Sequence, residues 1–304
     1  MRLCRFNSDR LGLIEDDSVA DVSEALGELS AHRWGAFAGD PLILALPRVM
    51  DAATRLRASA PRVPLASVEL KSPITQPGKI MAAPANYSLH VKETIDPGID
   101  HGVHSKALEG VERPPEKYGL FLKALSALVG AGQGVDLVFP DRRTDHEIEL
   151  AVIIGVGGHS ISASKAMEHV AGYSIGLDMT VRGAEDRSFR KSPDSYCVLG
   201  PAIVTRDEID DPMALELTLS VNGVLKQTSS TSVMTVGIAE LIALASRMYT
   251  LQPGDVLLTG TPQGVGAVRP GDVMQCSCSG IGEMQVPVRL HGNHASARDP
   301  NKAD

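Results

Sequence analysis

From residue 79 onward, the chain is built from short apolar runs separated by glycine and proline turns. These runs are rarely joined by the regular crossover helices that a parallel, doubly wound sheet requires. The predicted strands are residues 79–84, 149–156, 202–205, 215–223, 255–260 and 283–290. Two other stretches, 162–170 and 236–250, have helical periodicity. We therefore expect a mixed, β-rich α+β fold, with the second of these helices covering the sheet rather than forming a subunit interface.

The first seventy residues have a different pattern. Short alternating runs predict a few antiparallel strands, and residues 39–59 place apolar side chains at helical spacing. The next stretch, 60–79, holds four prolines and is typical of an extended connector. We predict a small N-terminal α/β domain over residues 1–72 and a larger domain over residues 73–304.

Composition limits the classes of partner. The 304 residues are 43% hydrophobic, which is enough for a substantial core. The formal net charge of -8 and the absence of a strong basic patch argue against binding nucleic acid or an anionic membrane. The N-terminus lacks the apolar core of a signal peptide, and no run is long enough for a membrane span. We expect a cytoplasmic protein whose four scattered cysteines are reduced packing thiols.

Three acids alternate at the start of one predicted strand, in the sequence DHEIELAVI. Because alternate side chains of a strand point to one side, Glu147 and Glu149 would lie close enough to repel each other. Two such carboxylates are half of a site for a hard divalent cation, and Asp178, at the end of another apolar run, is a candidate third ligand. Alternatively, the two glutamates line a solvated strand face and Asp178 caps a turn.

Two further motifs carry candidate chemistry. His90 and Glu93 are three residues apart in NYSLHVKE, so one helical turn would bring them together, as a general base and the carboxylate that orients it. A surface contact between the two is the alternative. The glycine-rich stretch 257–266, LLTGTPQGVG, follows an apolar strand and offers backbone N–H groups to a carboxylate or oxyanion. It is alternatively a plain connection.

A basic segment follows Asp178. Arg182, Arg190 and Lys191 would suit an anionic substrate such as a keto acid, and a lysine can stabilise a developing enolate or oxyanion. Alternatively, they are surface charges paired with Glu185 and Asp186.

Taken together, DHEIELAVIIG, GYSIGLDMTVRG, RKSPDSYCVLGP and LQPGDVLLTGTPQGVG resemble motifs of the fumarylacetoacetate hydrolase family in order and separation. NYSLHVKE and LFLKALSALVG resemble its two upstream motifs. The resemblance covers residues 79 to 290 and points to prokaryotic members of the acylpyruvate hydrolase and 2-hydroxyhepta-2,4-diene-1,7-dioate isomerase type. It implies a β-roll catalytic domain, a homodimer, and Mg²⁺ or Mn²⁺ as cofactor.

The resemblance also assigns roles. It implies metal ligands Glu147, Glu149 and Asp178, catalytic residues His90, Glu93 and Lys191, and substrate-binding residues Tyr87, Lys123, Arg182, Gly260 and Thr261. The implied reaction is hydrolysis of a carbon–carbon bond in a 1,3-diketo acid, in aromatic-compound catabolism. His90 would activate the water, Lys191 would stabilise the developing charge, and the metal would hold the pyruvate-type enolate.

Other members of the family imply alternatives. The same metal site serves isomerisation or decarboxylation of 2-hydroxymuconate-type diacids and decarboxylation of oxaloacetate, and the fold could also persist in a non-catalytic metal-binding protein. The His90–Glu93 pair favours hydrolysis, because the other reactions need no nucleophilic water. Two features depart from the family pattern: Glu185 stands where glutamine is common, and the segment 94–118, with His101 and His104, is long and suggests a lid over the site.

Overall fold

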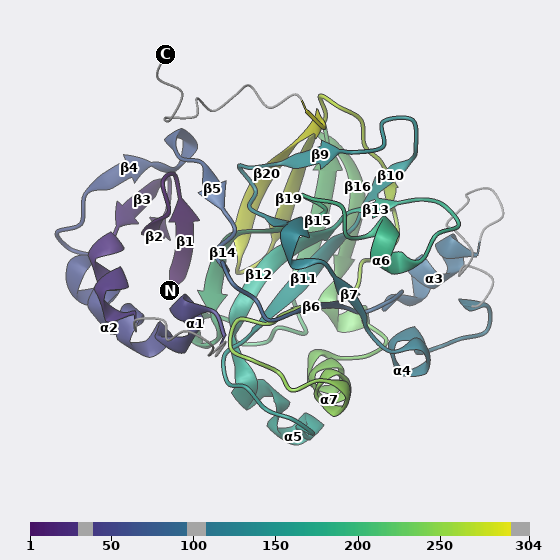
Figure 1. Cartoon of the computed structure of the whole chain (residues 1–304), viewed down its shortest axis with the longest axis horizontal. Coiled ribbons are helices and arrows are strands. Elements are labelled where there is room, and N and C mark those ends of the chain that lie inside the picture. Colours follow the sequence, from purple (N-terminus) through teal and green to yellow (C-terminus); the bar gives the residue numbers. More distant parts are fainter. Residues whose placement is uncertain (30–38, 96–107, 293–304) are drawn as a thin grey trace, which may run out of the picture.

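The computed structural model of the chain describes residues 1–29, 39–95 and 108–292. Its largest sheet has 12 strands and joins the N-terminal strands to strands of the larger C-terminal part (Figure 1). In spatial order its main path is β4 (Arg62–Pro64), β3 (Ser18–Asp21), β2 (Arg10–Glu15), β1 (Arg2–Phe6), β14 (Cys197–Thr205), β12 (Val170–Asp178), β11 (Ile148–Ile154), β17 (Val256–Leu258), β6 (Ile80–Ala82) and β7 (Phe121–Lys123). Two short strands lie off this path: β5 (Leu70–Lys71) on β1 and β8 (Leu128–Val129) on β14.

Two smaller sheets complete the strand-rich part. One has the order β16 (Val224–Ser230), β15 (Glu216–Val221), β19 (Val273–Cys278), β20 (Gly282–Leu290) and β9 (Val135–Leu137). The other has the order β13 (Thr180–Val181), β10 (Thr144–His146) and β18 (Gly266–Ala267). Most neighbouring strands are antiparallel, and the parallel pairs are β6 with β17, β8 with β14 and β9 with β20. The expected mixed, β-rich fold is confirmed.

The helices are short and lie outside the sheets (Figure 1). They are α1 (Pro41–Leu44), α2 (Leu46–Leu56), α3 (Ser88–Thr94), α4 (Pro114–Tyr118), α5 (Ala163–Ala166), α6 (Arg187–Arg190) and α7 (Ile238–Met248). Helix α7 buries Ile238, Leu241, Ile242 and Ala245 in the main core, so it covers the sheet as expected. No helix among the described residues is both long and apolar enough to cross a membrane.

The N-terminal strands continue the main sheet. Leu3 of β1 pairs with Ile203 of β14, and both pack in one core with side chains of α2 such as Val49. That core also contains Leu258 of β17. The two predicted domains, residues 1–72 and 73–304, therefore share a continuous sheet and a core, and the division at residue 72 stays a prediction.

Strand β11 explains why its sequence turns wholly apolar after Glu149. All of its residues are buried, because the strand separates two cores. Alternate side chains such as Leu150 and Val152 enter the main core, while Ala151 and Ile153 enter the core shared with the N-terminal strands. A strand covered on both faces needs apolar residues at every position.

Candidate active site

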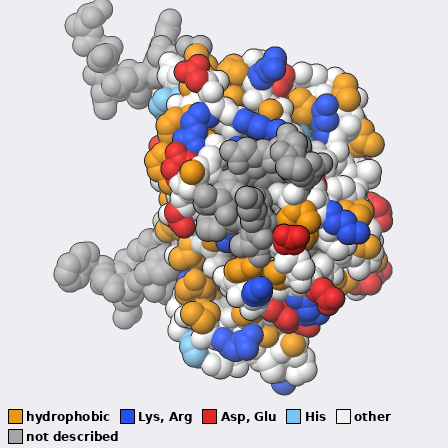
Figure 2. Space-filling view, turned by 90° about the vertical axis from the view of Figure 1, so that its right-hand side faces the viewer, with side chains coloured by type: hydrophobic (Ala, Val, Ile, Leu, Met, Phe, Trp, Pro, Cys, Tyr) orange, Lys and Arg blue, Asp and Glu red, His pale blue; other side chains and the backbone are white. Residues whose placement is uncertain are grey.

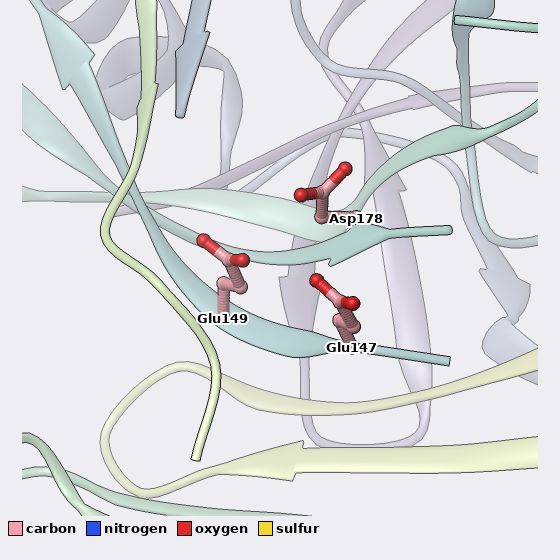
Figure 3. Close-up of side chains that lie close together, drawn as sticks. All are labelled: Glu147, Glu149 and Asp178. Atoms are coloured by element: carbon pink, nitrogen blue, oxygen red, sulfur yellow. The ribbon is translucent and has the colours of Figure 1, made fainter. Parts of the chain in front are cut away.

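The three predicted metal ligands converge. Glu147 immediately precedes β11, Glu149 lies within it, and Asp178 ends β12. Strands β11 and β12 are antiparallel, with Glu149 opposite Gly176, and the Asp178 N–H donates to the Glu147 carbonyl at 2.9 Å. This register places Glu147 opposite Asp178 on one face, and a carboxylate oxygen from each ligand lies within 4.8 Å of the others (Figure 3). All three are buried, so the solvated strand face is excluded.

Two of these carboxylates are already neutralised by lysines. Lys191 Nζ donates to Glu147 Oε2 at 2.8 Å, to Asp178 Oδ2 at 2.5 Å and to Thr180 Oγ1 at 2.7 Å. Lys123 Nζ donates to Asp178 Oδ1 at 2.5 Å and to the Lys191 carbonyl. Burial would raise the pKa of Glu147, but the charges of Lys191 and of the neighbouring Arg182 outweigh it and hold the pKa below its usual value.

Glu149 has a different environment. Among the described residues it forms no ion pair, and its Oε2 accepts a hydrogen bond from the Gly260 N–H at 2.5 Å. Burial and the charges of Asp178 and Glu147 raise its pKa well above the usual value. An additional positive charge at this point would stabilise the ionised form. An all-oxygen set with one uncompensated carboxylate fits a hard divalent cation such as Mg²⁺ or Mn²⁺.

Asp145, the remaining acid of the opening stretch, is not part of this cluster. Its Oδ1 accepts from Arg143 Nε at 2.6 Å, and its Oδ2 accepts from Arg182 Nε at 2.8 Å. Arg182 also donates to Glu147 Oε1 at 3.0 Å. Asp145 therefore holds Arg182 against the metal-ligand cluster. This positioning role was not foreseen, although the basic residues at 142 and 143 were a signal for it.

His90 and Glu93 lie on one side of α3, as predicted. His90 Nδ1 is 3.0 Å from Glu93 Oε2, and the Gly264 N–H donates to both carboxylate oxygens of Glu93, at 3.1 and 3.2 Å. Because a carboxylate only accepts, Nδ1 carries the proton and Nε2 is the basic nitrogen of the neutral ring. His90 is buried, which excludes a simple surface contact.

The glycine-rich loop binds carboxylates of the protein itself. The Gly260 N–H contacts Glu149, and the Gly264 N–H contacts Glu93. Both glycines have positive φ, 96° and 91°, and a Cβ on Gly264 would collide with the Lys226 carbonyl. Thr261 Oγ1 donates to the Ile148 carbonyl at 2.8 Å. A role of Gly260 and Thr261 in binding substrate stays a prediction.

The cluster of three metal ligands and His90 line the same cavity, which has a volume of about 60 Å³. Its lining includes His90, Glu147, Glu149, Asp178, Arg182, Lys191 and Thr261, together with Leu108, Phe121, Arg187 and Arg190. Among the other predicted substrate contacts, Lys123 is fully buried against Asp178, and Tyr87 is 1% exposed in the main core with no hydrogen bond to its hydroxyl from the described residues. Neither side chain lines the cavity.

Arg187 was missed by the sequence analysis. It was one of several basic residues in a charged segment, and only the turn of α6 shows which of them face the cavity. Glu185, the departure from the family pattern, lies outside the cavity lining and is 41% exposed in a bidentate ion pair with Arg142, at 2.8 and 2.7 Å. It therefore places no unpaired acid in the site. The predicted lid rests mainly on residues 96–107, including His101 and His104, which lie outside the described residues.

The family model described as "Fumarylacetoacetate (FAA) hydrolase C-terminal" matches residues 79–289. The chain belongs to the fumarylacetoacetate hydrolase family. The resemblance inferred from the motifs, and the fold that it implied, are thereby confirmed.

Relatives in the family extend over nearly the whole chain. A maleylpyruvate hydrolase of Aquipseudomonas alcaligenes is 50% identical over 290 residues, which cover 95% of this chain and 99% of that protein. A solved maleylpyruvate hydrolase from Sphingobium sp. SYK-6, in complex with manganese(II) ion and pyruvate, is 36% identical with a TM-score of 0.78, covering 95% of this chain and 99% of that one. A 2-hydroxyhepta-2,4-diene-1,7-dioate isomerase from Mycobacterium marinum is 29% identical with a TM-score of 0.65, covering 96% and 99% respectively.

Proposed function

We propose that this protein is a divalent-metal-dependent hydrolase that cleaves a carbon–carbon bond in acylpyruvates, with maleylpyruvate as the favoured substrate. The observation that carries the proposal is the presence of His90, held by Glu93, in the same cavity as the three converging carboxylates. A base that activates water is needed for hydrolysis and not for isomerisation or decarboxylation. The 50% identical maleylpyruvate hydrolase supports the substrate class.

His90 acts first in the proposed mechanism. Its Nδ1–H stays on Glu93, so Nε2 accepts a proton from a water molecule in the cavity. The hydroxide adds to the acyl carbonyl that is distal to the pyruvyl group, and the bond between that carbon and the pyruvyl methylene then breaks. The pair of electrons remains on the pyruvyl fragment, which takes up a proton to become pyruvate, while the acyl fragment leaves as a carboxylic acid.

The fixed charges around the cavity support that charge separation. A divalent cation, when bound, supplies Lewis-acid stabilisation of the negative charge that develops on the pyruvyl oxygen. Lys191 lies in the cavity lining, but Glu147, Asp178 and Thr180 occupy its three donors. Its role toward the substrate is therefore exerted through its positive charge, and it also fixes the two carboxylates. Arg182, anchored on Asp145, adds a second cation.

A small substrate panel tests this proposal. The purified protein with Mn²⁺ is assayed on maleylpyruvate, fumarylpyruvate, acetylpyruvate and oxaloacetate, with and without EDTA. We expect EDTA-sensitive hydrolysis of the acylpyruvates and a fall in kcat of about 10²- to 10⁴-fold in His90→Ala. His159→Ala, at an exposed histidine, is the matched control. Full hydrolysis by His90→Ala, or activity on oxaloacetate alone, would contradict the proposal.

Isomerisation is the second candidate, because the M. marinum isomerase shares the fold over nearly the whole chain. A non-catalytic metal-binding role is disfavoured, since the base, the lysine and the carboxylates are all present in the cavity. Adding a 2-hydroxyhepta-2,4-diene-1,7-dioate substrate to the panel separates the two reactions: an isomerase changes its absorption spectrum without releasing pyruvate.

We also propose a cytoplasmic homodimer. The four cysteines are buried and unpaired, which suits a reducing compartment. The dimer rests on family resemblance alone. Light scattering during size-exclusion chromatography tests it directly, and a mass of one chain, 32.2 kDa, would contradict it.

A further inference from the structure

One wall of the cavity carries two arginines, neither of which forms an ion pair with a carboxylate among the described residues. Arg187 and Arg190 begin and end α6, and both line the cavity. Arg190 donates from Nε to the Glu185 carbonyl at 2.7 Å and from Nη1 to the Val181 carbonyl at 3.3 Å, so backbone oxygens hold it. Within the described part of the chain, the Arg187 side chain forms neither an ion pair nor a hydrogen bond, and its guanidinium lies over an aromatic ring.

The other cations of the site are already in use. Arg182 is shared between Asp145 and Glu147, and Lys191 is shared between Glu147 and Asp178. Among the described residues of the lining, Arg187 is thus the cation with no hydrogen-bond donor engaged by another side chain or by the backbone. Burial lowers its pKa, although the charges of Asp186, Glu147 and Asp178 act in the opposite direction. A partly buried guanidinium that lines a substrate cavity without an ion pair favours an anionic ligand.

Phe121 orients this guanidinium. The Arg187 Cζ lies 5.7 Å from the centroid of the Phe121 ring, which comes from β7 and also lines the cavity. Contact with a ring face restrains the planar group while leaving its N–H edges free. Those edges form the fork that matches the two oxygens of a carboxylate.

We propose that Arg187 binds the distal carboxylate of a dicarboxylic acylpyruvate and thereby selects such substrates over acylpyruvates with an uncharged acyl group. The inference rests on the proposed function, because it takes the pyruvyl end of the substrate to lie at Glu147, Glu149 and Asp178. The acyl end then extends along the remaining cavity wall, which includes α6. Maleylpyruvate has a carboxylate at this end and acetylpyruvate has a methyl group.

Steady-state kinetics on this matched pair of substrates tests the inference. In Arg187→Gln we expect kcat/KM for maleylpyruvate to fall about 10- to 100-fold, the value of one charge-assisted hydrogen-bond pair, and kcat/KM for acetylpyruvate to change by less than about threefold. Arg187→Lys, which keeps the charge but not the fork, should fall between the two. Arg55→Gln on α2, at an exposed arginine, should affect neither substrate.

Calorimetric binding to the Mn²⁺-loaded protein gives a second readout that needs no turnover. Arg187→Gln should lose most of its affinity for maleate, the acyl product, and keep its affinity for pyruvate, which also shows that the variant is folded. Equal maleate binding by both proteins, or equal losses on both substrates, would overturn the role of Arg187. A wild-type protein that hydrolyses neither substrate, yet binds maleate only with Arg187 present, would instead overturn the proposed function and keep the anion site.

Discussion

The side chain of Gln227 links Thr261 to Ile148, the first residue of β11. Gln227 Nε2 donates to Thr261 Oγ1 at 2.8 Å and to the Pro262 carbonyl at 2.9 Å, while its Oε1 accepts from the Ile148 N–H at 3.1 Å. The backbone groups of Ile148 and Pro262 have fixed donor and acceptor roles, so they determine how the amide is oriented. His146 Nδ1, 2.9 Å from Oε1, must therefore carry its proton.

Replacing Gln227 should disturb both stability and catalysis. Gln227→Leu leaves the Ile148 N–H and the Pro262 carbonyl buried without partners, so we expect the free energy of unfolding to fall by at least about 2 kcal/mol. The loop that carries Thr261 also loses an anchor, and kcat/KM should fall more than metal affinity does. Urea denaturation, steady-state kinetics and metal titration measure the three effects. Gln285→Leu, at an exposed position of β20, is the control, and equal stability of the two variants would contradict the prediction.

His146 makes stability depend on pH. Burial lowers its pKa below the usual value of about 6.5, so the folded protein favours the neutral ring. Between about pH 6.5 and the lowered pKa of the folded state, the unfolded chain binds more protons, and the free energy of unfolding therefore falls as the pH falls. His146→Asn should flatten this slope in urea denaturation between pH 7.5 and 5.5, whereas His159→Asn, at an exposed site, should not. An unchanged slope in His146→Asn would contradict this assignment.

The sequence predicted the metal-ligand cluster because strand periodicity is local information. The alternation of Glu147 and Glu149 places both on one face of a strand, whatever the strand packs against. Asp178 is different: only the antiparallel register of β11 and β12 brings it opposite Glu147, and register is set by pairing over the whole strand. For Asp178 the family motifs supplied what periodicity could not.

Local sequence patterns could not predict the residues that contact the site from another sheet or from a short helix. Gln227 lies in β16, a strand that was not predicted. It donates a hydrogen bond to Thr261, which is 34 positions further along the chain. In the sequence, nothing distinguishes Arg187 from the basic residues around it. Its proposed role depends on the absence, among the described residues, of an ion pair to its guanidinium, which only the folded structure shows. The strands and helices that were predicted are those with strong local periodicity, such as β11 and α7.

Glu185 should be tolerant of substitution despite its position in a family motif. Its carboxylate pairs with Arg142 at the surface and does not line the cavity. Arg142 holds the pKa of Glu185 below its usual value, but the pair is exposed and solvent screens its charges. Glu185→Gln, which restores the common family residue, should change kcat/KM for maleylpyruvate by less than about twofold. A larger change would show that this position contacts the substrate.

The distribution of charges on the face that carries α3, α4 and α6 indicates which kinds of partner the protein can bind. Figure 2 shows basic, acidic and apolar side chains interspersed there among the described residues, rather than gathered in one basic stripe. That distribution agrees with the net charge of -8 and disfavours nucleic acid. We therefore expect nonspecific DNA to leave the mobility of the protein unchanged in a gel-shift experiment at 0.1 M salt. The Debye length there is about 10 Å, so charges in direct contact with DNA phosphates would still attract them. A retarded band would contradict the small-molecule assignment.

Metal binding should be coupled to deprotonation of Glu149. Its raised pKa means that the metal-free protein holds a proton on this carboxyl up to a higher pH than an ordinary glutamate does, and a cation must displace that proton to gain the third ligand. We expect Mn²⁺ binding to release protons, measured by calorimetry in buffers of different ionisation enthalpy, and to become tighter as pH rises.

At a concentration 100 times its dissociation constant, Mn²⁺ should stabilise the fold by about 2.7 kcal/mol, and EDTA should remove this gain. Glu149→Gln should abolish both the proton release and the stabilisation, and should leave the metal-free protein at least as stable as wild type, because the amide carries no charge to bury and its oxygen can still accept from the Gly260 N–H. Glu69→Gln, on an exposed side chain in the N-terminal connector, should leave all three unchanged; if it and Glu149→Gln bind Mn²⁺ equally well, Glu149 is not a ligand.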